Sequence, residues 1–180
     1  MEKLTGVLLV GGASRRFGSP KALARLGGET LAERAWCVLG EACGERLAVG
    51  KGADGLALPF PLHDDGIEVR APIAGVVAGL RAARYDVCVF LPVDCPLMTP
   101  GALRALAGAC RDAAVPPSGP LPGAYRKSAL PVLERCLDAA RLALRDALSE
   151  LETAVVDLEP ALVANVNTPA ELAALSAARA

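Results

Sequence analysis

The sequence predicts a three-layer α/β fold, with a mostly parallel central sheet and helices on both faces. Short apolar runs alternate with segments of helical spacing, and helix-start signals follow several of these runs. Such alternation is typical of parallel strands joined by helical crossovers. The chain has 180 residues, no internal repeat and no long linker, so we expect residues 1–180 to form a single domain.

The first half of the chain shows clear start signals for a strand and a helix. Residues 7–10 are too few and too rich in β-branched side chains for a helix, which favours a buried strand. Thr30 and Glu33 have the spacing of a capping box, which begins a helix. Gly75 and Gly79 lie four residues apart and allow close helix packing. The expected elements are a strand at 7–10, a helix from 30 to about 39, strands at 46–49 and, interrupted by two prolines, 56–62, and a helix at 73–83.

The second half continues the same alternation. Residues 87–91 form the clearest buried strand, which ends where Pro92 and Pro96 stop the hydrogen-bond ladder. The Pro/Gly-dense segment 116–123 predicts a mobile loop. The other expected elements are a helix from 99 to about 110, a strand at 113–115, helices from 128 or 130 to 139 and at 142–151, a strand at 154–158, and a final helix opened by a capping box at 168–171.

The composition excludes several classes of protein. Hydrophobic residues make up 53% of the chain and the formal net charge is −1, so no basic surface is expected to gather nucleic acid. The apolar runs are far shorter than the ~20 residues of a membrane-spanning helix, and the N-terminus lacks the layout of a signal peptide. We therefore expect a cytoplasmic protein without a nucleic-acid or membrane partner. Its six cysteines form no CxxC pair and are expected to be reduced.

The glycine-rich loop after the first strand, residues 11–21, is the most informative segment. Its glycines let backbone amides approach an anion, and Arg16 and Lys21 add positive charge, a combination suited to phosphates. Gly18 is followed by Ser-Pro-Lys, so the loop is not a Walker A motif, and it does not match GxGxxG. A flexible basic loop with a solvated face is the alternative interpretation.

Polar residues also follow other expected strands, at the edge where open α/β sheets bind ligands. Asp94 offers the oxygen ligand that Mg²⁺ takes together with phosphates, or it caps a turn. Asp64 and Asp65 could accept from a base or ribose, or form an Asx turn. Asn165 and Asn167 lie on one side of an extended segment and could bind a polar substrate or cap the next helix.

Four further residues have two interpretations each. Arg126 and Lys127 could contact an acidic ligand or belong to a solvated turn. Trp36 lies among apolar neighbours and is interpreted as a core residue rather than a stacking platform. His63 is interpreted as a surface or structural residue rather than a catalytic base.

Five segments together resemble the molybdenum cofactor guanylyltransferase family, the MobA-like nucleotidyltransferases. The opening family motif, Leu-Ala-Gly-Gly-x-Ser-x-Arg-Met-Gly-x-x-Lys, is matched at residues 9–21, with Val10 for Ala and Phe17 for Met. Gly-Pro-Leu-Ala-Gly is matched at 71–75, Asp-x-Pro at 94–96, an Ala-Leu-Tyr-Arg-Lys-Ser-like stretch at 123–128 and Asn-x-Asn-Thr-Pro-x-Asp-Leu at 165–172. The motifs follow the family's order along nearly the whole chain, so the resemblance implies a Rossmann-like nucleotidyltransferase fold.

The resemblance also implies roles for individual residues. The guanine nucleotide would be bound by Leu9, Val10, Gly11, Gly12, Ser14, Lys21, Asp64 and Asp94. Arg16, Lys21 and Asp94 would be catalytic, and Asp94 would bind Mg²⁺. Arg126, Lys127, Asn165 and Asn167 would bind the pterin substrate. The family also uses an Asn after the second strand to contact the nucleotide, whereas residues 48–51 are Ala-Val-Gly-Lys.

The implied reaction is transfer of GMP from GTP to the terminal phosphate of molybdopterin cofactor, with release of pyrophosphate. A cytidylyltransferase acting on the same cofactor, a nucleotide-binding module without turnover and, more distantly, a P-loop NTPase are the alternatives. We expect a monomer or weak homo-oligomer that makes transient contacts with proteins that synthesise the cofactor or with molybdoenzymes.

Overall fold

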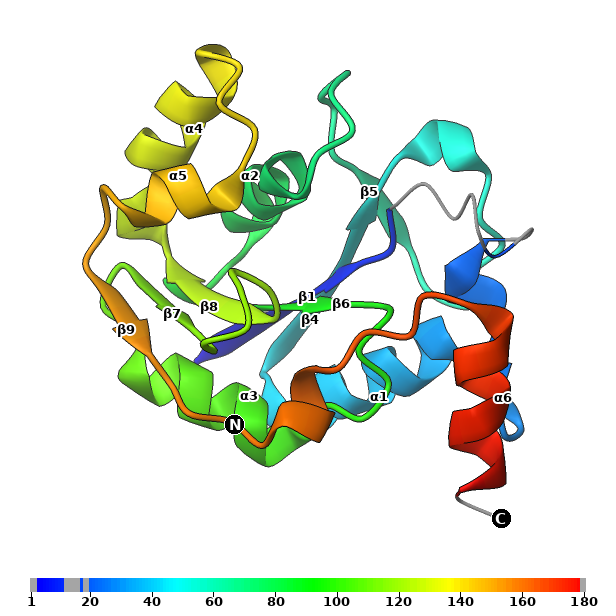
Figure 1. The fold of residues 1–180 in the computed structure, drawn as a ribbon. Coiled ribbons are helices and arrows are strands. Elements are labelled where there is room, and N and C mark those ends of the chain that lie inside the picture. Colours follow the sequence, from blue (N-terminus) through cyan, green and yellow to red (C-terminus); the bar gives the residue numbers. More distant parts are fainter. Residues whose placement is uncertain (1–2, 12–16, 18–19, 179–180) are drawn as a thin grey trace.

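A seven-stranded sheet crosses the centre of the molecule in the order β5-β4-β1-β6-β8-β7-β9 (Figure 1). The computed structural model describes residues 3–11, 17 and 20–178. The strands of this sheet are β1 (Leu4–Leu9), β4 (Glu45–Gly50), β5 (Leu62–Asp64), β6 (Val87–Pro92), β7 (Ala113–Val115), β8 (Gly123–Arg126) and β9 (Thr153–Val155). The short strands β2 (Arg25–Leu26) and β3 (Glu29–Thr30) form a separate antiparallel pair.

The sheet is mostly parallel, as predicted. β1 pairs in parallel with β4 and β6, β4 with β5, and β7 with β9. β8 alone among the described strands of this sheet is antiparallel to both of its neighbours, β6 and β7. The carboxyl ends of β1, β4 and β6 therefore share one edge, whereas the end of β8 lies at the opposite edge.

Helices cover both faces of the sheet, and each face has its own hydrophobic core. The helices are α1 (Leu31–Ala42), α2 (Pro72–Ala82), α3 (Pro100–Ala109), α4 (Leu130–Asp138), α5 (Leu144–Leu148) and α6 (Pro169–Ala177). Figure 1 shows α1 and α3 on one face and α2, α4 and α5 on the other. Alternate residues of β6 serve the two cores: Val89 and Leu91 pack with α1 and α3, while Cys88 and Phe90 pack with α2 and α4.

Local signals in the sequence explain where two of these helices begin and how closely one of them packs. Thr30 Oγ1 accepts from Glu33 N, and Glu33 Oε2 accepts from Thr30 N, which confirms the capping box. At α6, Thr168 Oγ1 accepts from Glu171 N, but the Glu171 carboxylate bonds Asn167 N instead of completing a box. A Cβ at Gly79 would lie 2.7 Å from Phe90 Cε1, so α2 needs a glycine here to reach the sheet.

The structure corrects three expectations about elements and adds a strand to the sheet. Residues 56–61 form no strand, because Pro59 and Pro61 cannot donate to a ladder, and β5 pairs with β4 only at 62–64. The strand β8 was not expected. The helix expected at 142–151 is confined to α5, and the strand expected at 154–158 ends at Val155. The other expected elements occur, with ends that differ by a few residues.

The side chains expected in the interior behave in two ways. The cysteines are free thiols, and Cys88, Cys95, Cys110 and Cys136 are buried, as expected for reduced core residues. Trp36 packs against the core but also stacks on Phe60, with ring centroids 4.1 Å apart. None of the described helices is long and apolar enough to cross a membrane.

Candidate active site

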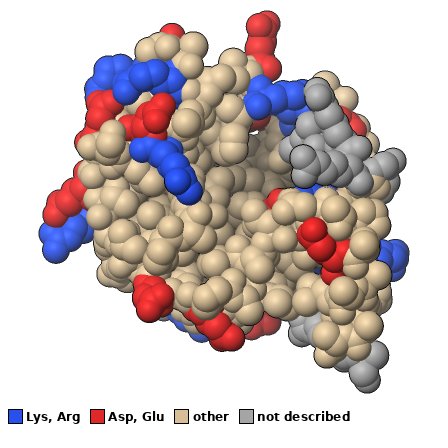
Figure 2. Space-filling view, viewed as in Figure 1, with Lys and Arg blue, Asp and Glu red and all other residues tan. Residues whose placement is uncertain are grey.

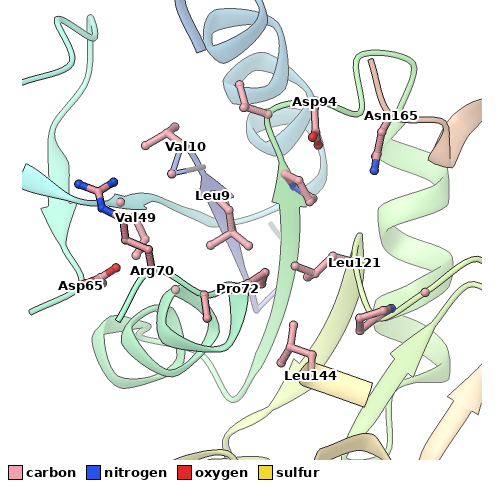
Figure 3. A pocket seen from close by; sticks show the side chains of 18 of the residues that line it. Leu9, Val10, Val49, Asp65, Arg70, Pro72, Asp94, Leu121, Leu144 and Asn165 are labelled. Carbon is pink, nitrogen blue, oxygen red and sulfur yellow. The ribbon is translucent and has the colours of Figure 1, made fainter. Parts of the chain in front are cut away.

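A cavity of about 650 Å³ opens beyond the carboxyl ends of β1, β4 and β6 (Figures 2 and 3). Its wall includes Gly11, from the glycine-rich loop, and Asp94 and Asn165, two of the polar residues expected at the ligand-binding edge of the sheet. Asp65, the residue after Asp64, also lines it. Parallel pairing explains this convergence, because it brings the ends of strands far apart in the sequence to one edge of the sheet.

Lys21 and Asp94 form an ion pair in the middle of this edge. Lys21 Nζ lies 3.1 Å from Asp94 Oδ2 and donates to Asn167 Oδ1 at 3.3 Å. The Lys21 and Asp94 side chains are 15% and 23% exposed, so water screens the pair only in part. Three predicted site residues from three separate segments therefore meet at one point.

Backbone hydrogen bonds hold these segments together. Val93 N donates to Leu9 O at 3.1 Å, which extends the β1–β6 pairing to the residue before Asp94. Val166 N donates to Asp94 O at 2.8 Å, which fixes the segment that carries Asn165 and Asn167 against the end of β6. These two bonds fix Asp94 and the segment 165–167 to the end of β6 at the centre of the sheet.

Asn165 is oriented by a buried thiol. Cys95 Sγ donates to Asn165 Oδ1 at 3.0 Å, and Figure 3 shows the Asn165 side chain reaching into the cavity beside Asp94. Burial, together with the nearby charge of Asp94, raises the pKa of the Cys95 thiol to about 12. Cys95 therefore stays protonated at neutral pH and acts as a hydrogen-bond donor, not as a nucleophile.

One half of the cavity is formed by the ends of β1 and β4. Leu9, Val10 and Gly11 line it, as predicted for a nucleotide-binding segment, and Val10 N is already bonded to Val49 O. Asp65 stands on this side and is 6% exposed. Its Oδ1 accepts from Lys51 Nζ at 2.8 Å, and Lys51 Nζ also donates to Ile67 O and to Val69 O.

The carboxylate of Asp64, which was predicted to contact the nucleoside, binds backbone amides instead. Its oxygens accept from Gly52 N and Gly66 N, both at 2.8 Å. These two backbone hydrogen bonds lower the pKa of the Asp64 carboxyl. The side chain is exposed and does not line the cavity, so the neighbouring Asp65 takes its place in the site proposed below.

The other half of the cavity is formed by the β7–β8 connection and by the segment before and at the start of α5. Ser118, Gly119, Pro120 and Leu121 contribute from the first, and Leu142, Ala143 and Leu144 from the second. Leu121 and Leu144 lie across the cavity from Val10 and Val49 in Figure 3, with Asp94 and Asn165 along a third side. We call the β1–β4 side of this single cavity its first lobe and the opposite side its second lobe; Lys21 and Asp94 line the same cavity.

Arg126 and Lys127, predicted to bind substrate, lie at the opposite edge of the sheet. Arg126 pairs with Val87, the first residue of β6, and its guanidinium binds Asp86 Oδ2 at 2.7 Å. Lys127 Nζ donates to Ala83 O at 2.6 Å. The antiparallel direction of β8 carries both residues away from the cavity, and they are not part of the site.

Some predicted site residues lie outside the described part of the chain, and the sequence analysis missed other parts of the site. Gly12, Ser14 and Arg16 lie outside the described residues. The sequence analysis considered Asp65 beside Asp64 but assigned the nucleoside contact to Asp64, and it did not predict Lys51, Arg70 or the second lobe. Lys51 could have been found, because it lies just beyond the strand expected at 46–49, whereas the second lobe depends on the unexpected strand β8.

A divalent cation fits the donor chemistry at Asp94. Among the described residues, no group of three or more His, Cys, Asp or Glu side chains could hold a metal ion by itself. A carboxylate oxygen is nonetheless a suitable ligand for Mg²⁺ when phosphate oxygens complete the coordination. Asp94 therefore suits an ion that arrives with a nucleotide.

Comparison with known proteins agrees with this geometry. The chain is 34% identical to a probable molybdenum cofactor guanylyltransferase of Chloroflexus aggregans, over 94% of this chain and 91% of that protein. It is 36% identical to the protein of the same description from Deinococcus radiodurans, over 98% and 95% of the two chains.

The fold is similar to that of solved structures. The crystal structure of molybdopterin-guanine dinucleotide biosynthesis protein A from Archaeoglobus fulgidus superposes with a TM-score of 0.82 and 25% identity, covering 97% of this chain and 98% of that one. The family model described as the MobA-like NTP transferase domain matches residues 6–155. The chain belongs to the MobA-like NTP transferase domain family.

Proposed function

We propose that this protein transfers GMP from GTP to the terminal phosphate of molybdopterin and releases pyrophosphate. One observation carries the proposal: the Lys21–Asp94 pair lines the same cavity as both lobes, so a nucleotide on one side and an acceptor on the other would share that pair. The relatives described as molybdenum cofactor guanylyltransferases support this choice of substrates. Residues 1–180 act as a single domain, as a monomer or weak homo-oligomer in the cytoplasm.

The first lobe suits a guanine nucleotide. Asp65 presents a carboxylate, and guanine carries adjacent N1–H and N2–H₂ donors that a carboxylate accepts. Lys51 holds this carboxylate in place through their ion pair and through the carbonyl groups of Ile67 and Val69. The pair thereby supplies a base contact next to the stretch 48–51, which lacks the Asn that the family uses to contact the nucleotide.

The chemistry needs no activated side chain. An oxygen of the acceptor phosphate forms a bond to the α-phosphorus of GTP, and the bond from that phosphorus to the bridging oxygen breaks. Pyrophosphate leaves with the electron pair. Lys21 neutralises charge that develops on the phosphates, while Asn165 and Asn167 orient the acceptor. Asp94 would hold Mg²⁺, which would supply further neutralisation of the phosphate oxygens when bound.

The test is pyrophosphate release in the presence of molybdopterin and Mg²⁺ with each of the four nucleoside triphosphates. We expect release with GTP and its loss when Mg²⁺ is removed by chelation. A preference for CTP would show that the protein is a cytidylyltransferase and not a guanylyltransferase. Nucleotide binding without release of pyrophosphate would indicate a binding module, and release of phosphate an NTPase.

A further inference from the structure

The second lobe lacks an evident group to hold a charged acceptor. The cavity wall here consists mainly of the apolar residues Pro120, Leu121, Leu142, Ala143 and Leu144. These surfaces suit a flat ring system. The proposed acceptor is also an anion, and Arg126 and Lys127, the cations predicted for it, lie at the opposite edge of the sheet.

Arg145 lies at the rim of this lobe. It follows Leu144, which is 4% exposed and fixes the start of α5 in the core. Its Nη2 donates to Ser118 O at 3.3 Å, and a Cβ at Gly119 would lie only 3.7 Å from the same nitrogen. The guanidinium therefore rests against two residues that line the lobe, while the side chain remains exposed to solvent.

Arg145 differs from its basic neighbours in its partners. Arg135 and Arg141 both bind the carboxylate of Glu150, at 2.5 and 2.7 Å. Within the described part of the chain, Arg145 forms no ion pair, and its hydrogen bond to Ser118 O uses one of the five N–H donors of a guanidinium. Figure 2 shows basic side chains on both sides of the hollow, with acidic side chains nearby.

We propose that Arg145 binds an anionic group of the acceptor in the second lobe. The inference rests on the proposed function, which places an anionic acceptor there. A guanidinium beside a cavity wall can offer two parallel N–H donors to a phosphate or another oxyanion, and such charge-assisted bonds are about twice as strong as neutral ones. Arg145 thus determines affinity for the acceptor, whereas Lys21 acts at the reacting phosphates.

The test is equilibrium binding of molybdopterin, and in parallel of GTP, to four proteins. Arg145→Gln removes the charge but keeps a donor for Ser118 O, and Arg145→Lys keeps the charge. Arg111→Gln is the matched control, because Arg111 is also exposed and pairs with Glu152 at the opposite edge of the sheet. Thermal unfolding of each variant shows that it is folded.

We expect Arg145→Gln to weaken molybdopterin binding about tenfold, or about 1.4 kcal/mol, and to leave GTP binding unchanged, because the substitution removes a hydrogen bond between two charged groups. Arg145→Lys should retain most of the affinity, and Arg111→Gln all of it. If dephosphorylated molybdopterin is insensitive to Arg145→Gln, the phosphate is the bound anion; an equal loss identifies another anionic group of the acceptor.

Three results would overturn the inference: a wild-type protein that does not bind molybdopterin, an Arg145→Gln protein that binds it as wild type does, or an equal loss in the Arg111→Gln protein. Wild-type binding of both ligands without release of pyrophosphate would instead refute the proposed function and leave the role of Arg145 in binding intact.

Discussion

Replacement of Lys21 by Met removes the charge at the centre of the proposed site and keeps the aliphatic stem. Lys21 Nζ lies 3.1 Å from Asp94 Oδ2, and both side chains are less than a quarter exposed. In the GTP complex the same ammonium group is expected to face the phosphates. The substitution therefore has one effect on folding and a separate effect on turnover.

The two effects differ in size. Exposed ion pairs contribute about 0–1 kcal/mol, and breaking a fully buried pair costs about 3–5 kcal/mol, so this half-buried pair should cost about 1–3 kcal/mol. A domain with a stability of about 5–15 kcal/mol remains folded after that loss. Removal of one preorganised group that stabilises developing charge lowers kcat about 10²–10³-fold. The kcat of a folded protein should therefore fall about 10²–10³-fold.

The assay measures pyrophosphate release with GTP, molybdopterin and Mg²⁺, alongside the thermal unfolding midpoint. Lys127→Met is the matched control, because Lys127 bonds Ala83 O at the opposite edge of the sheet and should be dispensable for turnover. A folded Lys21→Met protein with wild-type kcat would refute the role of Lys21. Equal losses in both variants would show that the effect is structural.

Two further predictions concern stability. Gly79→Ala should lower the free energy of unfolding in urea by about 1–3 kcal/mol, because the new Cβ would lie 2.7 Å from Phe90 Cε1. Gly108→Ala in α3 is the control and should not destabilise the fold, because a Cβ there meets nothing within 4 Å. Burial raises the pKa of the Cys88 and Cys95 thiols from 9.0 to about 12. The pKa of each thiol is therefore higher in the folded protein than in the unfolded chain. The free energy of unfolding is unaffected by these thiols below pH 9, and it falls as the pH rises from 9 toward 12, because the unfolded chain then loses its thiol protons first. A urea midpoint that does not fall over that interval would contradict it.

The elements that the sequence predicted correctly carry their signal within a few residues. The strand at 87–91 is a continuous apolar run because both of its faces are buried, and it occurs as β6. The capping box at Thr30 and Glu33 needs no distant partner and occurs as expected. The meeting of Lys21, Asp94 and Asn167 followed from the parallel sheet, since the loops at one edge of such a sheet converge.

The choice between Asp64 and Asp65 could not be made from the sequence. Successive residues of an extended chain face opposite sides, so a difference of one position decides which carboxylate enters the cavity. The pairing of Gly50 with Asp64 and the bond from Asp65 N to Gly50 O set that position. Both interactions depend on where β5 pairs with β4. The sequence did not show where β5 begins, because Pro59 and Pro61 interrupt the apolar run before it.

The error over Arg126 and Lys127 and the missed second lobe have one cause, the direction of β8. β7 is parallel to β9 and ends at the edge that carries the cavity. Because β8 is antiparallel to β7, it begins at this same edge and runs to the opposite one. The connection at 116–122 therefore becomes a wall of the cavity, and Arg126 at the far end of β8 is carried to the opposite edge. A sheet of parallel strands alone would have formed only the wall at the ends of β1 and β4, and so only the first lobe. The reversal of a single four-residue strand supplies the second wall, and with it a place for a second substrate beside the Lys21–Asp94 pair.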